Sequence, residues 1–276
     1  MVWLFHFFLL SVIFAPSALA QIWTENAGTI SPTAPVLREM ISIQRNQNLN
    51  EVRLESAFGY SWEPGQELRL VVPWVWRSGQ FRGQSFSQNG LGDLRLRYKG
   101  LLFKEDRVMA SERLAWLTEL TLPTGESGAN PGGLRLPREL QNGMGSWQLG
   151  MGVAYTRIED RHRWAVETMF RKGLSGPIPD QLEANLAYWY RLTPERFSDD
   201  GDFEVRGVVE LLASHRFGGQ LPNMRGDLIW LAPGLQLYPS PDFQLELSLQ
   251  IPLHQSVNDA LGTRRIGGAL AAKFQF

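Results

Sequence analysis

Apolar and polar residues alternate along most of this chain with a period of two. Residues 243–253 carry an apolar side chain at every odd position and a polar one at four of the five even positions. Residues 265–276 show the same alternation, with apolar and small side chains at the even positions. Because successive side chains of a strand point to opposite faces, this pattern predicts strands with one face toward hydrocarbon and the other toward water.

Twelve segments show this alternation, although it is weak in the first and in the tenth. They are residues 35–44, 51–62, 66–77, 93–104, 111–122, 146–158, 162–172, 181–191, 203–215, 227–238, 242–253 and 265–276. Short connections alternate with longer ones, except at 192–202, and an even strand number places the longer ones on one side of a membrane. We therefore predict an all-β fold, an antiparallel transmembrane β-barrel of about 12 strands.

The N-terminal part of the chain has the features of an export signal. An apolar run over residues 2–15 is shorter than the ~20 residues of a membrane-spanning helix, and small residues at 18–20 suit a cleavage site. We predict a cleaved signal peptide over 1–20, although no Lys or Arg precedes the apolar run. Residues 21–34 lack a period, and their brevity favours a flexible periplasmic lead-in over a plug in the lumen. The barrel then comprises residues 35–276.

Composition excludes several classes of function. The chain has 27 basic and 28 acidic residues, so its net charge of −1 gives no argument for binding nucleic acid. It has no cysteine and therefore no disulfide or thiolate site. Aromatic residues reach 11% although the mean hydropathy is −0.20. This combination suits a barrel with aromatic girdles and a wet lumen; a secreted β-sandwich would also show it, and the barrel is favoured by the export signal together with the last strand.

The last strand ends with two aromatic residues, Phe274 and Phe276, on its apolar face. This ending resembles the C-terminal signature by which bacterial outer-membrane barrels are recognised for insertion. It implies outer-membrane lipid and the barrel-assembly machinery as partners, and location in the outer membrane of a Gram-negative bacterium.

Several short motifs carry a family resemblance that covers most of the mature chain. They are F-G-Y-S-W at 58–62, E-L-R-L-V-V-P at 67–73, G-L-G-D-L-R-L-R-Y-K at 90–99, L-T-L-P-T-G at 120–125 and Q-I-P-L-H-Q-S-V-N at 250–258. They resemble the outer-membrane barrels labelled as a putative meta-pathway of phenol degradation, often called transporters. The resemblance implies a channel or transporter, with a loose link to aromatic compounds.

The inward face of the predicted strands is the candidate functional surface. Its lumen-lining candidates are Arg69, Arg95, Arg97, Lys99, Arg113, Glu119, Glu167, Arg171, Trp189, Arg206 and Glu246. A charge facing lipid near the bilayer midplane costs ~2–4 kcal/mol, so the inward face is favoured. One interpretation, which we prefer, is that Arg and Glu pair across strands and fill a narrow barrel. The other is that five of the basic candidates form a wall that favours anionic solutes. These five are Arg69, Arg95, Arg97, Lys99 and Arg113.

Catalytic patterns are scarce, and we predict no enzyme activity, no metal site and no cofactor. The exception is His254-Gln255-Ser256, which resembles the dyad of outer-membrane phospholipases. No third residue is placed to orient it, and a structural role is favoured. We therefore predict an outer-membrane channel or transporter for small solutes, anionic or aromatic ones among them. The alternatives are a lipid hydrolase that uses His254 and Ser256, and a closed structural barrel.

Overall fold

Thirteen β-strands make up most of the computed structural model, which describes residues 23–30, 34–128, 133, 135–195 and 203–276. The strands are β1 (Val36–Asn46), β2 (Leu49–Tyr60), β3 (Gln66–Phe81), β4 (Gln84–Leu91), β5 (Leu94–Arg107), β6 (Ala110–Leu122), β7 (Gln148–Glu159), β8 (His162–Gly173), β9 (Asp180–Thr193), β10 (Glu204–Phe217), β11 (Gly226–Ser240), β12 (Phe243–Gln255) and β13 (Arg264–Gln275). Two short 3₁₀ helices, η2 (Arg138–Leu140) and η3 (Pro222–Met224), lie in connections. The predicted signal peptide lies outside the described residues.

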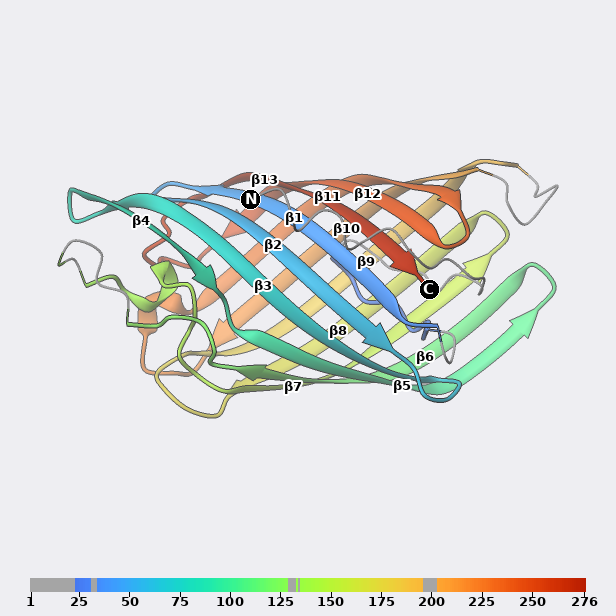
Figure 1. Cartoon of the computed structure of the whole chain (residues 1–276), viewed down its shortest axis with the longest axis horizontal. Coiled ribbons are helices and arrows are strands. Elements are labelled where there is room, and N and C mark those ends of the chain that lie inside the picture. Colours follow the sequence, from blue (N-terminus) through green and yellow to red (C-terminus); the bar gives the residue numbers. More distant parts are fainter. Residues whose placement is uncertain (1–22, 31–33, 129–132, 134, 196–202) are drawn as a thin grey trace.

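The sheet closes into a barrel (Figure 1), with twelve strand positions around its wall. β1 pairs antiparallel with β2 on one edge and with β13 on the other. β3 pairs with β2 along one edge, and along its other edge its second half pairs with β4 and its first half pairs with β5. β4 and β5 therefore occupy one strand position of the barrel between them. The predicted twelve-stranded antiparallel barrel is confirmed.

One segment predicted as a loop is a hairpin. Residues 78–92 were expected to connect two strands, but β3 continues to Phe81, and β4 starts after a two-residue turn at Arg82 and Gly83. Both turn residues have positive φ, 51° and 76°. The hairpin reaches beyond the barrel (Figure 1), where neither face has to meet lipid. No regular alternation of apolar and polar residues is required there, so the sequence does not show these strands.

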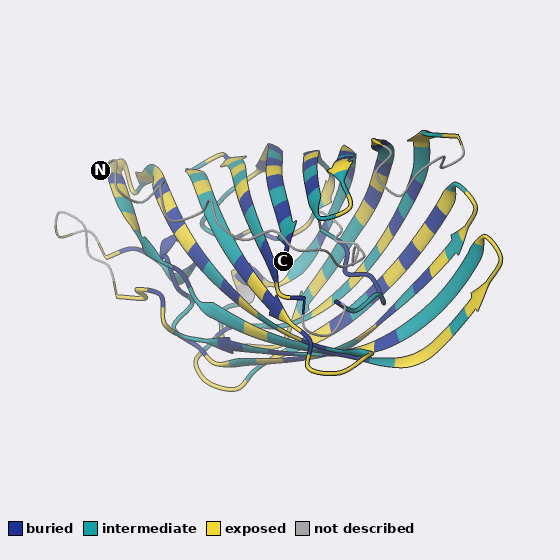
Figure 2. Ribbon diagram, turned by 45° about the vertical axis from the view of Figure 1, so that its right-hand side comes forward, coloured by how far each residue is buried: buried dark blue, intermediate teal, exposed yellow. Residues whose placement is uncertain are grey.

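The two faces of the wall differ as the alternation predicts. In β3 the side chains of Leu68, Leu70, Trp74 and Trp76 are exposed, whereas those of alternate positions such as Glu67 are buried. Figure 2 shows the same striping along the strands of the wall. An apolar outer band with aromatic residues is the surface that a transmembrane barrel presents to lipid. No helix among the described residues is long and apolar enough to cross a membrane.

The barrel has two unlike ends. One end carries the β3–β4 hairpin and most of the longer connections, and we call it the loop end; the short β1–β2 connection also lies there. The other carries the start of β1, the end of β13 and most of the short connections, and we call it the turn end; the longer β9–β10 connection is its exception. Here Phe274 stacks on Phe243 with 4.9 Å between ring centroids, and the Phe276 N–H donates to the Pro35 carbonyl oxygen. The two aromatics thus lie at the seam where β13 meets β1. Their role in membrane insertion stays a prediction.

Candidate functional site in the barrel lumen

The described N-terminal residues, 23–30, lie inside the lumen. The Thr24 N–H donates to Glu210 Oε1 over 2.8 Å, and the Glu25 N–H donates to Glu167 Oε2 over 2.9 Å. Glu210 is in β10 and Glu167 is in β8, and the Ile30 N–H donates to Glu67 in β3. The segment therefore crosses between distant parts of the wall. A flexible lead-in is wrong for residues 23–30, because lumen-facing carboxylates bind their main chain.

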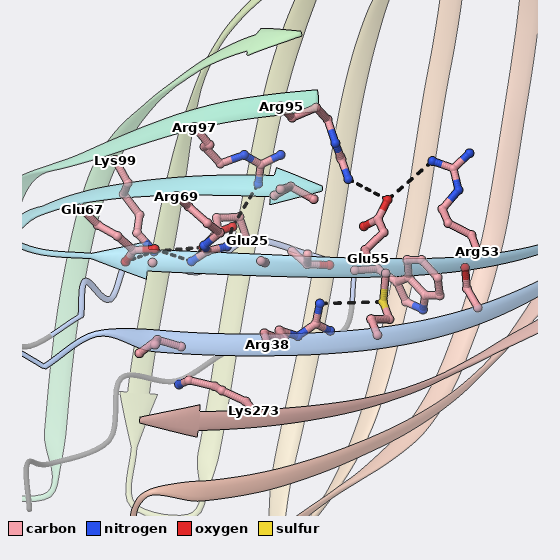
Figure 3. A pocket seen from close by; sticks show the side chains of 18 of the residues that line it. Glu25, Arg38, Arg53, Glu55, Glu67, Arg69, Arg95, Arg97, Lys99 and Lys273 are labelled. Carbon is pink, nitrogen blue, oxygen red and sulfur yellow. Dashed lines mark hydrogen bonds and ion pairs between the residues drawn. The ribbon is translucent and has the colours of Figure 1, made fainter. Parts of the chain in front are cut away.

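Glu25 is the electrostatic centre of this segment (Figure 3). Its Oε2 accepts hydrogen bonds from Arg69 Nη1 and Arg97 Nη1, each at 2.9 Å. Its Oε1 lies 2.9 Å from Lys99 Nζ. Three cations from the two paired strands β3 and β5 thus bind one carboxylate. We call Arg69, Arg97 and Lys99 the basic trio.

The wall itself supplies further carboxylates to the basic trio. Glu67 pairs with Arg69 and lies 3.2 Å from Lys99, and Glu119 lies 2.6 Å from Arg97. Strand register explains both contacts, because Lys99 is opposite Glu67 and Arg97 is opposite Glu119. Register thus places wall carboxylates directly across from Lys99 and Arg97, at ion-pair distance from both cations.

The five predicted basic-wall residues do not form one group. Arg95 Nη2 donates to Glu55 over 2.8 Å, and Arg113 Nε donates to Ser111 over 3.2 Å. A bulge in β5 between Leu101 and Phe103 shifts the register with β6 near Arg113. Only the basic trio therefore converges on one point.

The remaining lumen-lining candidates lie at other places on the inner face. Glu167 also accepts from Asn185, Arg171 pairs with Glu119 and Glu183, and Arg206 pairs with Glu204. Glu246 lies 2.6 Å from Arg38 Nη2. Trp189 is fully buried against Ala165, Ala187 and Val208, so it packs the wall and is not open to a solute.

A chamber of about 360 Å³ lies beside the N-terminal segment. Seven basic residues line it, against four acidic ones, Glu25, Glu51, Glu55 and Glu67. The basic residues are Arg38, Arg53, Arg69, Arg95, Arg97, Lys99 and Lys273. Lys273 is buried and makes no ion pair within 4 Å among the described residues. Trp23, Met40 and Val71 add apolar surface, so the chamber offers both positive charge and hydrocarbon contact.

A second cavity, of about 400 Å³, lies toward the loop end. It shares Trp23, Arg53 and Glu51 with the chamber, so Trp23 lies where the two spaces adjoin. At the same end Arg264 forms a two-point ion pair with Asp259, with contacts of 2.8 and 2.6 Å. This pair fixes the connection between β12 and β13 beside the cavity.

The connection between β6 and β7 folds back at the loop end. The Asp93 carboxylate, between β4 and β5, accepts from the Gly125 N–H over 3.0 Å and from the Met144 N–H over 2.7 Å. Burial raises the pKa of Asp93 above its ordinary value, although these two N–H groups oppose the rise. Leu140 packs in a buried cluster with Phe86 of β4. The described part of this connection is therefore attached to β4 and to the junction of β4 and β5.

The His254 and Ser256 pair does not have the geometry of a catalytic dyad. Ser256 Oγ accepts from the Asp227 N–H over 2.7 Å and donates to Asp227 Oδ2 over 3.3 Å. His215 Nδ1 lies 2.7 Å from Asp227 Oδ1. The described part of the chain shows no hydrogen bond between Ser256 and a histidine, so nothing there activates the hydroxyl. It also shows no group of three residues suited to hold a metal ion.

Sequence reasoning did not select Glu25, Trp23 or Lys273 as site residues. A signal for Glu25 was present, because it is the only charged residue between Arg38 and the histidine at position 6. A single acidic residue in a segment otherwise free of charge suggests that this residue has a specific partner. Lys273 lies on the polar face of the last strand. Sequence alone does not show that no carboxylate of the described residues lies within 4 Å of its ammonium group.

The fold and site define an outer-membrane β-barrel whose lumen holds its own N-terminal segment. The crystal structure of the COG4313 outer membrane channel from Pseudomonas putida F1 is similar, with a TM-score of 0.71 and 12% identity over 93% of this chain and 100% of that one. The β domain of the Bordetella autotransporter BrkA gives a TM-score of 0.50 and 11% identity over 88% and 99%.

The family described as "Putative MetA-pathway of phenol degradation" matches residues 41–266, and the chain belongs to that family. The predicted family resemblance is thus confirmed. A comparison with curated proteins found no match.

Proposed function

We propose that this protein is an outer-membrane channel for small organic solutes and that it favours anions. The observation that supports the proposal is the chamber, which seven basic and four acidic side chains line. Small-molecule sites in proteins have volumes of ~300–1,000 Å³, and the chamber of about 360 Å³ falls at the lower end of that range. The similar structure described as an outer membrane channel supports the channel role, and the phenol degradation in the family description supports aromatic compounds as solutes.

Access to the chamber supports the same proposal. The second cavity adjoins it at Trp23, Arg53 and Glu51, so a solute from the loop end crosses the second cavity, passes these residues and then reaches the chamber. Most lumen cations pair with carboxylates, which balances their fields. Lys273 has no such partner among the described residues and is therefore the residue expected to dominate the preference for anions.

The test is the reversal potential of the purified protein in planar bilayers under a gradient of dilute KCl. A unit charge about 7 Å from a passing ion changes its energy by ~0.6 kcal/mol in water, with opposite sign for cations and anions. After partial screening, Lys273→Gln should lower the ratio of chloride to potassium permeability roughly threefold. Lys172→Gln, which removes an exposed charge from the outer face of β8, is the control and should leave the ratio unchanged.

Two results would contradict the proposal. Wild-type protein that inserts into bilayers without conductance would show a closed structural barrel. A channel with cation preference, or with a ratio that Lys273→Gln does not change, would remove the role of the chamber charges.

A further inference from the structure

The contact between Glu25 and the basic trio has the chemistry of a carboxylate-binding site. Both oxygens of the Glu25 carboxylate are bound, Oε2 by two guanidinium groups and Oε1 by an ammonium group, all at 2.9 Å. Arg69 and Arg97 are directly opposite each other on β3 and β5, and Lys99 lies two residues from Arg97 on the same face. The cations are therefore placed by the wall, whereas the carboxylate comes from a segment outside the wall.

Charge balance shows why this site needs an anion. The wall supplies Glu67 and Glu119 to the three cations, and Glu119 is also shared with Arg171. Without Glu25 the wall therefore keeps an excess of positive charge. The Lys99 side chain is only 3% exposed with the segment in place, so withdrawal of Glu25 leaves a desolvated ammonium group without one of its two carboxylate partners. Withdrawal of Glu25 is unfavourable unless another anion replaces it.

A solute in the chamber can reach this site. Glu25 and all three cations are part of the chamber lining, together with Ile30. Val36, Ala57 and Val71 line the same space and offer hydrocarbon contact for the body of an organic acid. A carboxylate attached to a small apolar group matches this arrangement better than an inorganic anion or a neutral phenol.

We propose that the basic trio is a binding site for organic carboxylates, that Glu25 occupies it as an internal ligand, and that a solute carboxylate displaces Glu25. This inference rests on the proposed channel function and adds a solute class to it. Displacement removes the ionic anchor of residues 23–30, so binding of the solute and release of the segment are coupled. The Glu167 and Glu210 carboxylates, which accept the Glu25 and Thr24 N–H groups of the inserted segment, can bind these groups again when the solute leaves.

The test compares benzoate with benzamide, a neutral molecule of similar size and shape. In wild-type protein, benzoate should accelerate amide hydrogen exchange in residues 23–30, and benzamide should not. Glu25→Gln should accelerate exchange without any ligand and should tighten benzoate binding at least tenfold, because the internal competitor has lost its charge. Glu126→Gln, an exposed loop variant, is the matched control and should behave as wild type.

Equal benzoate affinity in wild type and Glu25→Gln would overturn the inference, as would exchange that responds equally to benzamide. The hydrogen-exchange comparison uses wild-type protein, so it decides the question even if Glu25→Gln does not fold. Chloride conductance, measured on the same samples, separates the two proposals. Conductance without benzoate competition would refute only the carboxylate site, whereas absence of conductance in every variant would refute the channel.

Discussion

Replacing Ala27 with phenylalanine should release the N-terminal segment from the lumen. Ala27 is fully buried in contact with a cluster that comprises Ala115, Leu117, Ala154 and Met169. Its N–H donates to Thr156 Oγ1 over 3.0 Å, which fixes the main chain against β7. A phenyl ring at this position has no free volume, because each of these neighbours is itself at most 1% exposed. The wall is braced by strand pairing, so the segment is the part that yields.

The expected size follows from the cost of overpacking. Extra atoms in a well-packed site cost ~1–3 kcal/mol. If the wall does not relax, that cost falls on the state with the segment inside. Because 1.4 kcal/mol is a factor of ten in an equilibrium constant, the ratio of released to inserted segment should rise roughly 5- to 150-fold.

Single-channel recording is the assay, with open probability as the measured quantity. Ala27→Phe should raise the open probability, and amide exchange in residues 23–30 should accelerate to match. The control is Ala184→Phe, which places the same ring on the outer, lipid-facing side of β9 and should change neither quantity. A folded Ala27→Phe protein with wild-type open probability would refute the reasoning, since the segment would then not limit passage.

Two further predictions concern topology and chemistry. Outer-membrane barrels have longer loops outside the cell and short turns in the periplasm. A cysteine in place of Ser85, in the β3–β4 hairpin at the loop end, should therefore react with an impermeant thiol reagent on intact cells, whereas one in place of Val108, which is 94% exposed at the turn end, should not. The opposite labelling would place the turn end outside the cell. Purified protein in detergent should hydrolyse no phospholipid, and Ser256→Ala should leave that result unchanged; serine-dependent turnover would establish the hydrolase alternative.

The alternation of residues predicts strands only where the environment enforces it. Within the membrane one face of each strand meets lipid and the other meets the lumen, so β12 and β13 were plain from the sequence. Beyond the membrane no face has to meet lipid, and the β3–β4 hairpin therefore carries no such pattern. The bulge near Phe103 is also absent from the pattern, since it depends on the pairing of β5 with β6.

For the site, the sequence predicts the orientation of single side chains but not the contacts between them. Alternation indicates which side chains face inward, as it does for Arg97 and Glu119. It does not indicate which of them meet, because that depends on the register between strands. The contact with Glu25 required still more, namely the path of a segment that has no secondary structure. The three cations could therefore be listed as inward-facing from the sequence, but their convergence on Glu25 could not be predicted.

The one-sided pairing of β4 has a consequence for neighbouring molecules in a crowded membrane. β4 pairs with β3 only, so among the described strands its other edge has no strand partner. Such an edge can add a strand from another protein. Here the Gln88 side chain donates to the Leu140 carbonyl oxygen, and Phe86 is buried beneath the same loop. The described part of the β6–β7 connection thus packs against β4. We expect that shortening this connection would expose the free edge of β4 and allow edge-to-edge aggregation.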